Sequence, residues 1–318
     1  MELRKDYILR RFVIVSELRG KRPFEFKESE VEDDASKCVF CPGKENETPS
    51  EIGHVGEPWN IRWMENKFHA LEPVGKCDIV TDNKYFTYSD AYGYHEVIIE
   101  TNDHKKQLHD LKDFEIKDLL KVYKNRMEDL SAKPHIQYVL IFKNHGKNAG
   151  TSLKHSHTQV VAFNHIPADI ADKLDAVKNY DACPYCEILN IEKGSDRRCF
   201  ENNSFVAFAP YASRFNYEIW IFPKKHYTSI SEFDDWEFLE LAQIIKKIVA
   251  RLKIMNASYN YFIHYTPKNS GYDKGLHFHF EITPRIETWG GLEDGSGTYV
   301  NKISPEHAAQ FYRGERES

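Results

Sequence analysis

Cys38-Val-Phe-Cys41 begins a spaced pattern that the chain contains twice. The pattern continues with Glu96, with His104 eight residues later and, after fifty-one further residues, with His155-Ser-His157. The second copy keeps both spacings and consists of Cys183-Pro-Tyr-Cys186, Glu218, His226 and His277-Phe-His279. Because chance seldom duplicates a frame of metal-ligand residues, the pattern predicts a tandem duplication.

Matching segments between these residues predict an α+β fold. Each copy contains two runs of β-branched and aromatic residues, which are typical of strands. The runs lie at 94–100, 136–142, 217–222 and 259–265. Apolar residues at helical spacing lie between the runs, at 111–123 and 241–252. Each copy is therefore expected to form an antiparallel sheet with helices packed on it.

Chain length and composition indicate a globular protein with two halves. The 318 residues suffice for two domains with separate cores, which we place at 1–178 and 179–318. Hydrophobic residues make up 41% of the chain, and no apolar run is long enough to span a membrane. The charged N-terminus lacks the features of a signal peptide, so we expect a cytoplasmic protein. A net charge of −6 disfavours nucleic acid as a partner.

The two cysteine pairs with distant histidines predict two zinc sites. Thiolates and imidazoles are the ligands that tetrahedral zinc takes, and four protein ligands close the site, which makes it structural. The expected ligands are Cys38, Cys41, His104 and His155 in the first copy, and Cys183, Cys186, His226 and His277 in the second. The alternative, buried thiols and core histidines without metal, does not explain two equally spaced copies.

His157 is the candidate nucleophile. Side chains alternate along a strand, so one histidine of the His-x-His triplet can bind metal while its neighbour faces a substrate. A neutral imidazole attacks phosphorus readily and can carry a transferred group. The preceding segment, 144–152, is rich in glycine, hydroxyl and amide groups and can approach a phosphate closely.

In combination, these residues resemble the galactose-1-phosphate uridylyltransferase family of the histidine triad superfamily. The active-site signature is matched by Asn144-x-Gly146-x-x-x-Gly150-x-Ser152-x-x-His155-x-His157-x-Gln159. The N-terminal basic motif is matched by Arg19-x-Lys-Arg22-Pro23, and the nucleoside-binding segment by Asn66-Lys-Phe68-x-Ala-Leu71. The likeness extends over essentially the whole chain, and the fold that it implies is a duplicated histidine-triad-like domain.

The resemblance implies transfer of a nucleotidyl group through a covalent histidine intermediate. His157 would attack the α-phosphorus of a nucleoside diphosphate sugar, and Gln159 would hydrogen-bond the phosphoryl oxygens. Ser152, Asn144, Gly150, Arg19 and Arg22 would contact phosphate or nucleotide, while Asn66 and Phe68 would contact ribose and base. A glutamine amide is a poor proton donor to a leaving group, which favours transfer to a sugar 1-phosphate over hydrolysis. The resemblance also implies a homodimer.

The nucleotide and several residues leave alternatives open. Cys183-Pro-Tyr-Cys186 resembles a sub-branch of the family that includes ADP-glucose phosphorylase. Uridylyl transfer to galactose 1-phosphate is therefore the first hypothesis, adenylyl transfer the second, and a zinc-stabilised nucleotide-binding module without turnover the third. His264 and His279 either border the active site or pack on a sheet, and segment 290–301 either closes over a substrate or forms an inert turn. Glu281, which replaces Gln159 in the second copy, predicts that this copy keeps the fold without the reaction.

Overall fold

The computed structural model describes residues 1–18, 34–268 and 275–317. Within them, both copies of the repeat contribute strands to one ten-stranded sheet in which all neighbouring strands are antiparallel. From edge to edge, its strands are β10 (Arg198–Glu201), β11 (Phe205–Phe208), β12 (Ile219–Pro223), β14 (His279–Pro284), β13 (Tyr259–His264), β8 (Tyr138–His145), β9 (His157–Phe163), β7 (Gly93–Ile99), β4 (Ile61–Glu65) and β3 (Glu51–Val55). The predicted α+β class with antiparallel sheets is confirmed.

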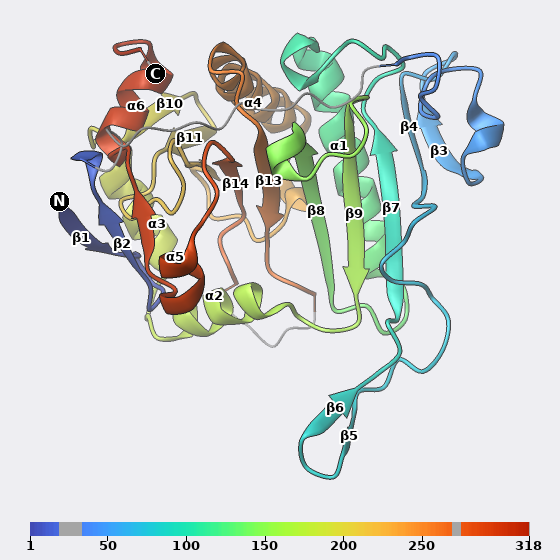
Figure 1. Cartoon of the computed structure of the whole chain (residues 1–318), viewed down its shortest axis with the longest axis horizontal. Coiled ribbons are helices and arrows are strands. Elements are labelled where there is room, and N and C mark those ends of the chain that lie inside the picture. The colour runs from blue at the N-terminus through green and yellow to red at the C-terminus, as the bar shows by residue number, and fades with distance from the viewer. Residues whose placement is uncertain (19–33, 269–274, 318) are drawn as a thin grey trace.

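The two copies meet at the pairing of β8 with β13, in the middle of the sheet (Figure 1). Phe142 of β8 lies opposite Phe262 of β13. On its other side Phe142 lies opposite Gln159, and Phe262 lies opposite Glu281. The two strand pairs therefore have the same register about this central pairing, and each residue of β8 has a defined counterpart in β13.

Two long helices, α1 (Asp113–Ser131) and α4 (Asp235–Ile254), cover one face of this sheet, behind the strands in Figure 1. α4 begins where the carboxylate of Asp234 accepts hydrogen bonds from the main-chain N–H groups of Trp236 and Glu237. The apolar faces of both helices belong to one hydrophobic core that draws on both copies. The halves thus share a core instead of having separate ones, because the β8 edge of one half is completed by the other. The division at 178/179 stays a prediction.

Shorter elements surround the opposite face and the edges. The helices are α2 (Ala168–Lys178), α3 (Pro184–Glu192), α5 (Gly291–Ser296) and α6 (Pro305–Arg313), and 3-10 turns occur at Glu45–Glu47, Leu108–Asp110, Lys147–Ala149 and Ile230–Glu232. A small sheet of β1 (Glu2–Lys5), β2 (Phe12–Val15) and β15 (Tyr299–Asn301) brings the two ends of the chain together. None of the helices in the described part of the chain is both long and apolar enough to cross a membrane.

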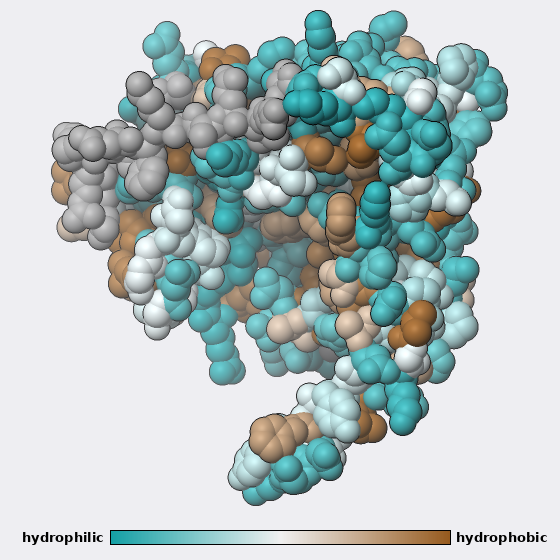
Figure 2. Space-filling model, turned by 45° about the vertical axis from the view of Figure 1, so that its right-hand side comes forward, coloured by the Kyte–Doolittle hydropathy of each residue, from teal (hydrophilic) through white to brown (hydrophobic). Residues whose placement is uncertain are grey.

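A hairpin of β5 (Val80–Asp82) and β6 (Phe86–Tyr88) stands away from the body in both Figure 1 and Figure 2. Its strands are exposed throughout, and Tyr85, Phe86 and Tyr88 have exposed fractions of 77%, 64% and 58%. Large aromatic side chains on a projecting arm are typical of a surface that contacts another protein.

Candidate active site and metal centres

The first four predicted metal ligands converge in the structure. One ligand atom each of Cys38, Cys41, His104 and His155 lies within 4.8 Å of the other three. His155 Nε2 donates a hydrogen bond to the main-chain oxygen of Thr101 at 2.7 Å, so the lone pair of its Nδ1 faces the thiols. A ring nitrogen held by a carbonyl in this way is the usual arrangement of a metal-binding histidine. The donor set and its geometry therefore fit a tetrahedral metal ion.

The second copy repeats this arrangement. The ligand atoms of the second set also lie within 4.8 Å of one another, and they belong to Cys183, Cys186, His226 and His277. His277 Nδ1 lies 3.5 Å from Cys186 Sγ, while its Nε2 lies 3.0 Å from the main-chain oxygen of Pro223. Both cysteine pairs are thus brought together with the histidines that the sequence assigned to them.

His157 begins β9, next to the first metal centre. Its Nδ1 lies 2.8 Å from the main-chain oxygen of His155 and must carry the proton, which leaves a lone pair on Nε2. Burial lowers the pKa of His157 to about 4; the His155 carbonyl opposes this shift and the Lys143 ammonium adds to it. The imidazole is therefore neutral at neutral pH and chemically suited to attack an electrophile. Phe40, which lies between the two cysteines in the sequence, packs edge to face against the His157 ring, with 5.4 Å between the ring centroids.

Gln159 is oriented by a histidine that the sequence did not identify. His95 Nδ1 accepts a hydrogen bond from the main-chain N–H of Ala70 at 3.1 Å, so its Nε2 carries the proton. That Nε2 lies 2.9 Å from Gln159 Oε1, to which it donates. Burial lowers the pKa of His95, which keeps this ring neutral. With its carbonyl end fixed, Gln159 turns its NH₂ group away from His95, and this group can donate to an anionic ligand.

The predicted nucleoside contacts lie beside this pair. The main-chain N–H of Asn66 donates to the main-chain oxygen of His95 at 2.8 Å, and Asn66 Oδ1 accepts from the main-chain N–H of Phe68 at 2.9 Å. The Phe68 side chain is 85% exposed and has a free ring face for stacking. Arg19 and Arg22, the two predicted phosphate contacts, lie outside the described residues.

The glycine-rich segment forms a tight loop between β8 and β9. Gly146 has φ +81°, and a Cβ there would lie 2.1 Å from Ser258 Oγ, so only glycine fits. Gly150 has φ +87°. Asn260 of the second copy donates to Asn144 Oδ1 at 2.7 Å and thereby fixes the start of the loop, a contact that the sequence did not reveal.

The loop also shapes the space around His157. Ser152 is exposed on it, between Gly150 and the His155-Ser-His157 segment. His157 borders a cavity of about 340 Å³ that is also lined by Asn144, Gly146, Lys147 and Thr151.

In the second copy a cavity of about 560 Å³ borders Glu281, the counterpart of Gln159, and its lining does not include His279. His279 Nδ1 bonds the main-chain oxygen of His277 at 2.8 Å, as in the first copy, but His279 is fully buried and stacks on Phe222. Lys173 of α2 contacts Glu281 and lies 3.4 Å from His279 Nε2. Both histidines left open by the sequence, His264 and His279, thus pack in a buried cluster on the sheet.

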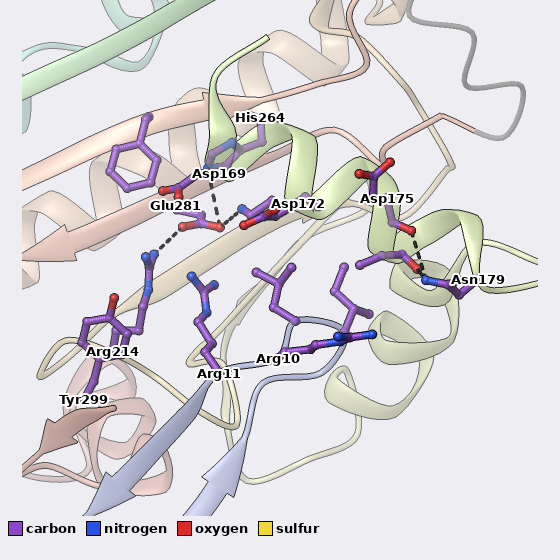
Figure 3. A pocket seen from close by; sticks show the side chains of 15 residues that line it. Arg10, Arg11, Asp169, Asp172, Asp175, Asn179, Arg214, His264, Glu281 and Tyr299 are labelled. Carbon is purple, nitrogen blue, oxygen red and sulfur yellow. Dashed lines mark hydrogen bonds and ion pairs between the residues drawn. The ribbon is translucent and has the colours of Figure 1, made fainter. Parts of the chain in front are cut away.

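Figure 3 shows the polar surroundings of Glu281. Arg214 Nη2 lies 3.0 Å from Glu281 Oε2, and His264 Nε2 lies 3.5 Å from Glu281 Oε1. Together with Lys173 these groups surround the carboxylate with positive charge and hydrogen-bond donors. In the first copy, the neutral Gln159 leaves this space free of an internal anion.

Known proteins are similar to this chain over almost its whole length. The family model described as "Galactose-1-phosphate uridyl transferase, N-terminal domain" matches residues 2–167, and that of the C-terminal domain matches residues 141–288. The chain belongs to the galactose-1-phosphate uridylyltransferase family. It is an enzyme of the transferase type, as the resemblance of its motifs implied.

Similar members of the uridylyltransferase family differ in their named activities. ADP-glucose phosphorylase from Arabidopsis thaliana is 32% identical over 98% of this chain and 92% of its own length. Galactose-1-phosphate uridylyltransferase from Thermotoga maritima is 30% identical over 98% of both chains. The crystal structure of the Arabidopsis ADP-glucose phosphorylase with bound ADP-glucose has a TM-score of 0.85 and 32% identity, and covers 100% of this chain and 99% of its own.

Proposed function

We propose that this enzyme transfers a nucleotidyl group by double displacement through His157. Nε2 of His157 attacks the α-phosphorus of a nucleoside diphosphate sugar, and the bond to the sugar 1-phosphate breaks. The nucleotidyl group then stays on Nε2 until the phosphate of a second acceptor attacks the same phosphorus and frees the histidine. The observation that carries this proposal is the contact of His157 Nδ1 with the His155 carbonyl, which puts the proton on Nδ1 and leaves the lone pair on Nε2 of a ring that borders a cavity.

The neighbouring side chains take their roles from this reaction. The NH₂ group of Gln159, with its carbonyl held by His95, donates to the oxygens of the α-phosphate as charge develops on them. Asn144, Gly150 and Ser152 contact the phosphates from the loop. Asn66 contacts the ribose and Phe68 stacks on the base, while Arg19 and Arg22 supply positive charge.

Two substrates fit the family. Uridylyl transfer from UDP-glucose to galactose 1-phosphate is the first candidate, in keeping with the description of the matching family models. Adenylyl transfer from ADP-glucose to inorganic phosphate is the second. It is supported by the 32% identity to ADP-glucose phosphorylase and by the TM-score of 0.85 to the structure of that enzyme with ADP-glucose bound.

Zinc is the metal we propose for both Cys2His2 centres. Soft thiolates together with imidazole nitrogens suit zinc, and four protein ligands leave no position for a substrate. The first centre anchors His155, whose main chain orients His157, so its zinc acts on the reaction only through the fold.

We also propose a cytoplasmic homodimer. Unpaired thiols in two metal-binding sets suit a reducing compartment. The exposed aromatic residues of the β5–β6 hairpin offer a surface for a second copy of the chain.

Turnover with matched substrate pairs tests the reaction and names the nucleotide. Purified enzyme is given UDP-glucose with galactose 1-phosphate, or ADP-glucose with inorganic phosphate, and the nucleotide products are separated by chromatography. We expect UDP-galactose from the first pair or ADP from the second, together with glucose 1-phosphate, and no product from His157→Ala. Equal turnover by His157→Ala would rule out the covalent route.

A further inference from the structure

A buried ion pair lies behind His157, and the reaction steps above do not involve it. Lys143 of β8 and Glu100, which directly follows β7, have side-chain exposures of 1% and 0%. Lys143 Nζ lies 2.7 Å from Glu100 Oε2. Removing two charges from water is costly, and a buried pair is often no more stabilising than well-packed apolar residues. A gain in folding free energy is therefore a poor explanation for the presence of this ion pair.

The pair binds three consecutive residues around the nucleophile. Lys143 Nζ donates to Ser156 Oγ at 3.0 Å and to the main-chain oxygen of His157 at 3.1 Å. Glu100 accepts hydrogen bonds from the hydroxyls of Ser156 and Thr158, both at 2.5 Å. The ammonium thus makes three hydrogen bonds, its full capacity. Lys143 and Glu100 therefore hold the residue before His157, His157 itself and the residue after it.

The second copy builds the same strands without these polar groups. Because Phe142 and Phe262 occupy equivalent positions in the strand pairing, Lys143 corresponds to Ile263. The residues on either side of His279, equivalent to Ser156 and Thr158, are Phe278 and Phe280, both buried. The fold therefore forms with apolar side chains in these places. The ion pair of Lys143 and Glu100 thus belongs to the copy whose histidine, His157, borders a cavity.

We propose that Lys143 and Glu100 are positioning residues that hold His157 where its Nε2 can attack phosphorus. This inference rests on the nucleotidyl transfer proposed above. The His155 carbonyl sets the orientation of the His157 ring, and the ion pair fixes the main chain that carries both residues. Displacement of a reacting group by about 1 Å can slow a reaction roughly a hundredfold. Residues that fix the position of His157 are therefore expected to affect the rate of the chemical step.

Rapid-quench measurements of nucleotidyl-enzyme formation test the proposal on the full chain. The variants are Lys143→Met, Glu100→Gln and the double variant Lys143→Met/Glu100→Gln, which removes both charges at once. Arg126→Met is the matched control, because Arg126 forms a buried pair with Glu96 in the same half, at 2.7 Å and with exposures of 8% and 4%. Each protein is mixed with UDP-glucose and, separately, with ADP-glucose, and its melting temperature is recorded.

We expect Lys143→Met to form the adduct about 10 to 100 times more slowly, with the half-saturating concentration of nucleotide sugar changed less than about twofold. Its melting temperature falls because Glu100 is left buried and unpaired. The double variant regains much of that loss but stays slow, since the bond to the His157 carbonyl is still missing. Arg126→Met also melts earlier but forms the adduct at the wild-type rate.

Two results would overturn the positioning role while leaving the reaction intact. One is a double variant that forms the adduct as fast as the wild type. The other is an Arg126→Met variant that is slowed as much as Lys143→Met, since loss of any buried pair would then explain the effect. A wild-type chain that forms no adduct with either sugar nucleotide overturns the reaction and the positioning role together.

Discussion

Among single residues, Gln159 of the first copy and its counterpart Glu281 have different surroundings. His95 holds the carbonyl end of Gln159, so the NH₂ group is left to donate to a ligand, whereas Glu281 in the second copy is an acceptor that contacts the cations of Lys173 and Arg214. We expect Gln159→Glu to lower kcat roughly 100- to 1,000-fold, the usual loss when a donor to a developing negative charge is removed. Steady-state kinetics measures this, with unchanged circular dichroism as the control for folding. Near-normal kcat in Gln159→Glu would contradict the proposed role of the amide.

The sequence predicted the residues that belong to spaced motifs and missed those that depend on strand register. The two sets of metal ligands and His157 share fixed spacings, and the structure brings each set of ligands together. The sequence predicts His95 only as part of the strand at 94–100. It reaches Gln159 because β7 pairs with β9 so that Val97 lies opposite Gln159, and no local pattern encodes that pairing.

Among the structural elements, the loop between β8 and β9 depends most on glycine. Gly146 has φ +81° and ψ 161°, a conformation that residues with a side chain avoid, and Ser258 leaves no space for a Cβ. We expect Gly146→Ala to destabilise the enzyme by about 1–3 kcal/mol and to reduce kcat by displacing the loop from His157. Denaturant unfolding and steady-state kinetics measure the two effects. Gly291→Ala is the control, since a Cβ there meets nothing within 4 Å; equal behaviour of both variants would contradict this reading.

Helix and strand positions followed the periodicity of the sequence closely. The helices expected at 111–123 and 241–252 are present as α1 (Asp113–Ser131) and α4 (Asp235–Ile254). α1 begins two residues later than expected and extends further at its C-terminal end, while α4 extends further at both ends and begins at the cap formed by Asp234. The pairing of β8 with β13 was not predicted. The residues of both strands are typical of internal strands and do not indicate their neighbours. The two strands lie side by side because α1 and α4 pack on a common face of the sheet.

Across the whole molecule, the shared sheet makes the two halves depend on each other. A fragment of residues 1–178 would expose the β8 edge and the apolar side chains that face the second half in the shared core. We expect this fragment to aggregate or to bind a hydrophobic dye when expressed alone, and to become soluble when co-expressed with residues 179–318. Size-exclusion chromatography distinguishes these cases. A monomeric, cooperatively melting fragment 1–178 would show instead that the halves are independent domains.

The two sets of cysteine and histidine residues that could bind metal lie in opposite halves of this common sheet. We expect about two zinc ions per chain, and roughly one in Cys183→Ser, together with a lower melting temperature, because metal binding contributes directly to folding. Elemental analysis and thermal unfolding provide the measurements. Cys77→Ser is the matched control, since Cys77 belongs to neither ligand set. Wild-type protein purified with less than one metal ion per chain, or a full metal content in Cys183→Ser, would count against both centres.

The proposed mechanism requires a covalent nucleotidyl group on His157, which intact-mass spectrometry detects. The enzyme is incubated with UDP-glucose or ADP-glucose without an acceptor, and the modified peptide is then located by digestion. We predict a mass increase of one uridylyl or adenylyl group on the peptide that contains His157, its loss when the acceptor phosphate is added, and no increase in His157→Ala. An unmodified wild-type chain with both nucleotide sugars, or an adduct that persists in His157→Ala, would contradict the mechanism.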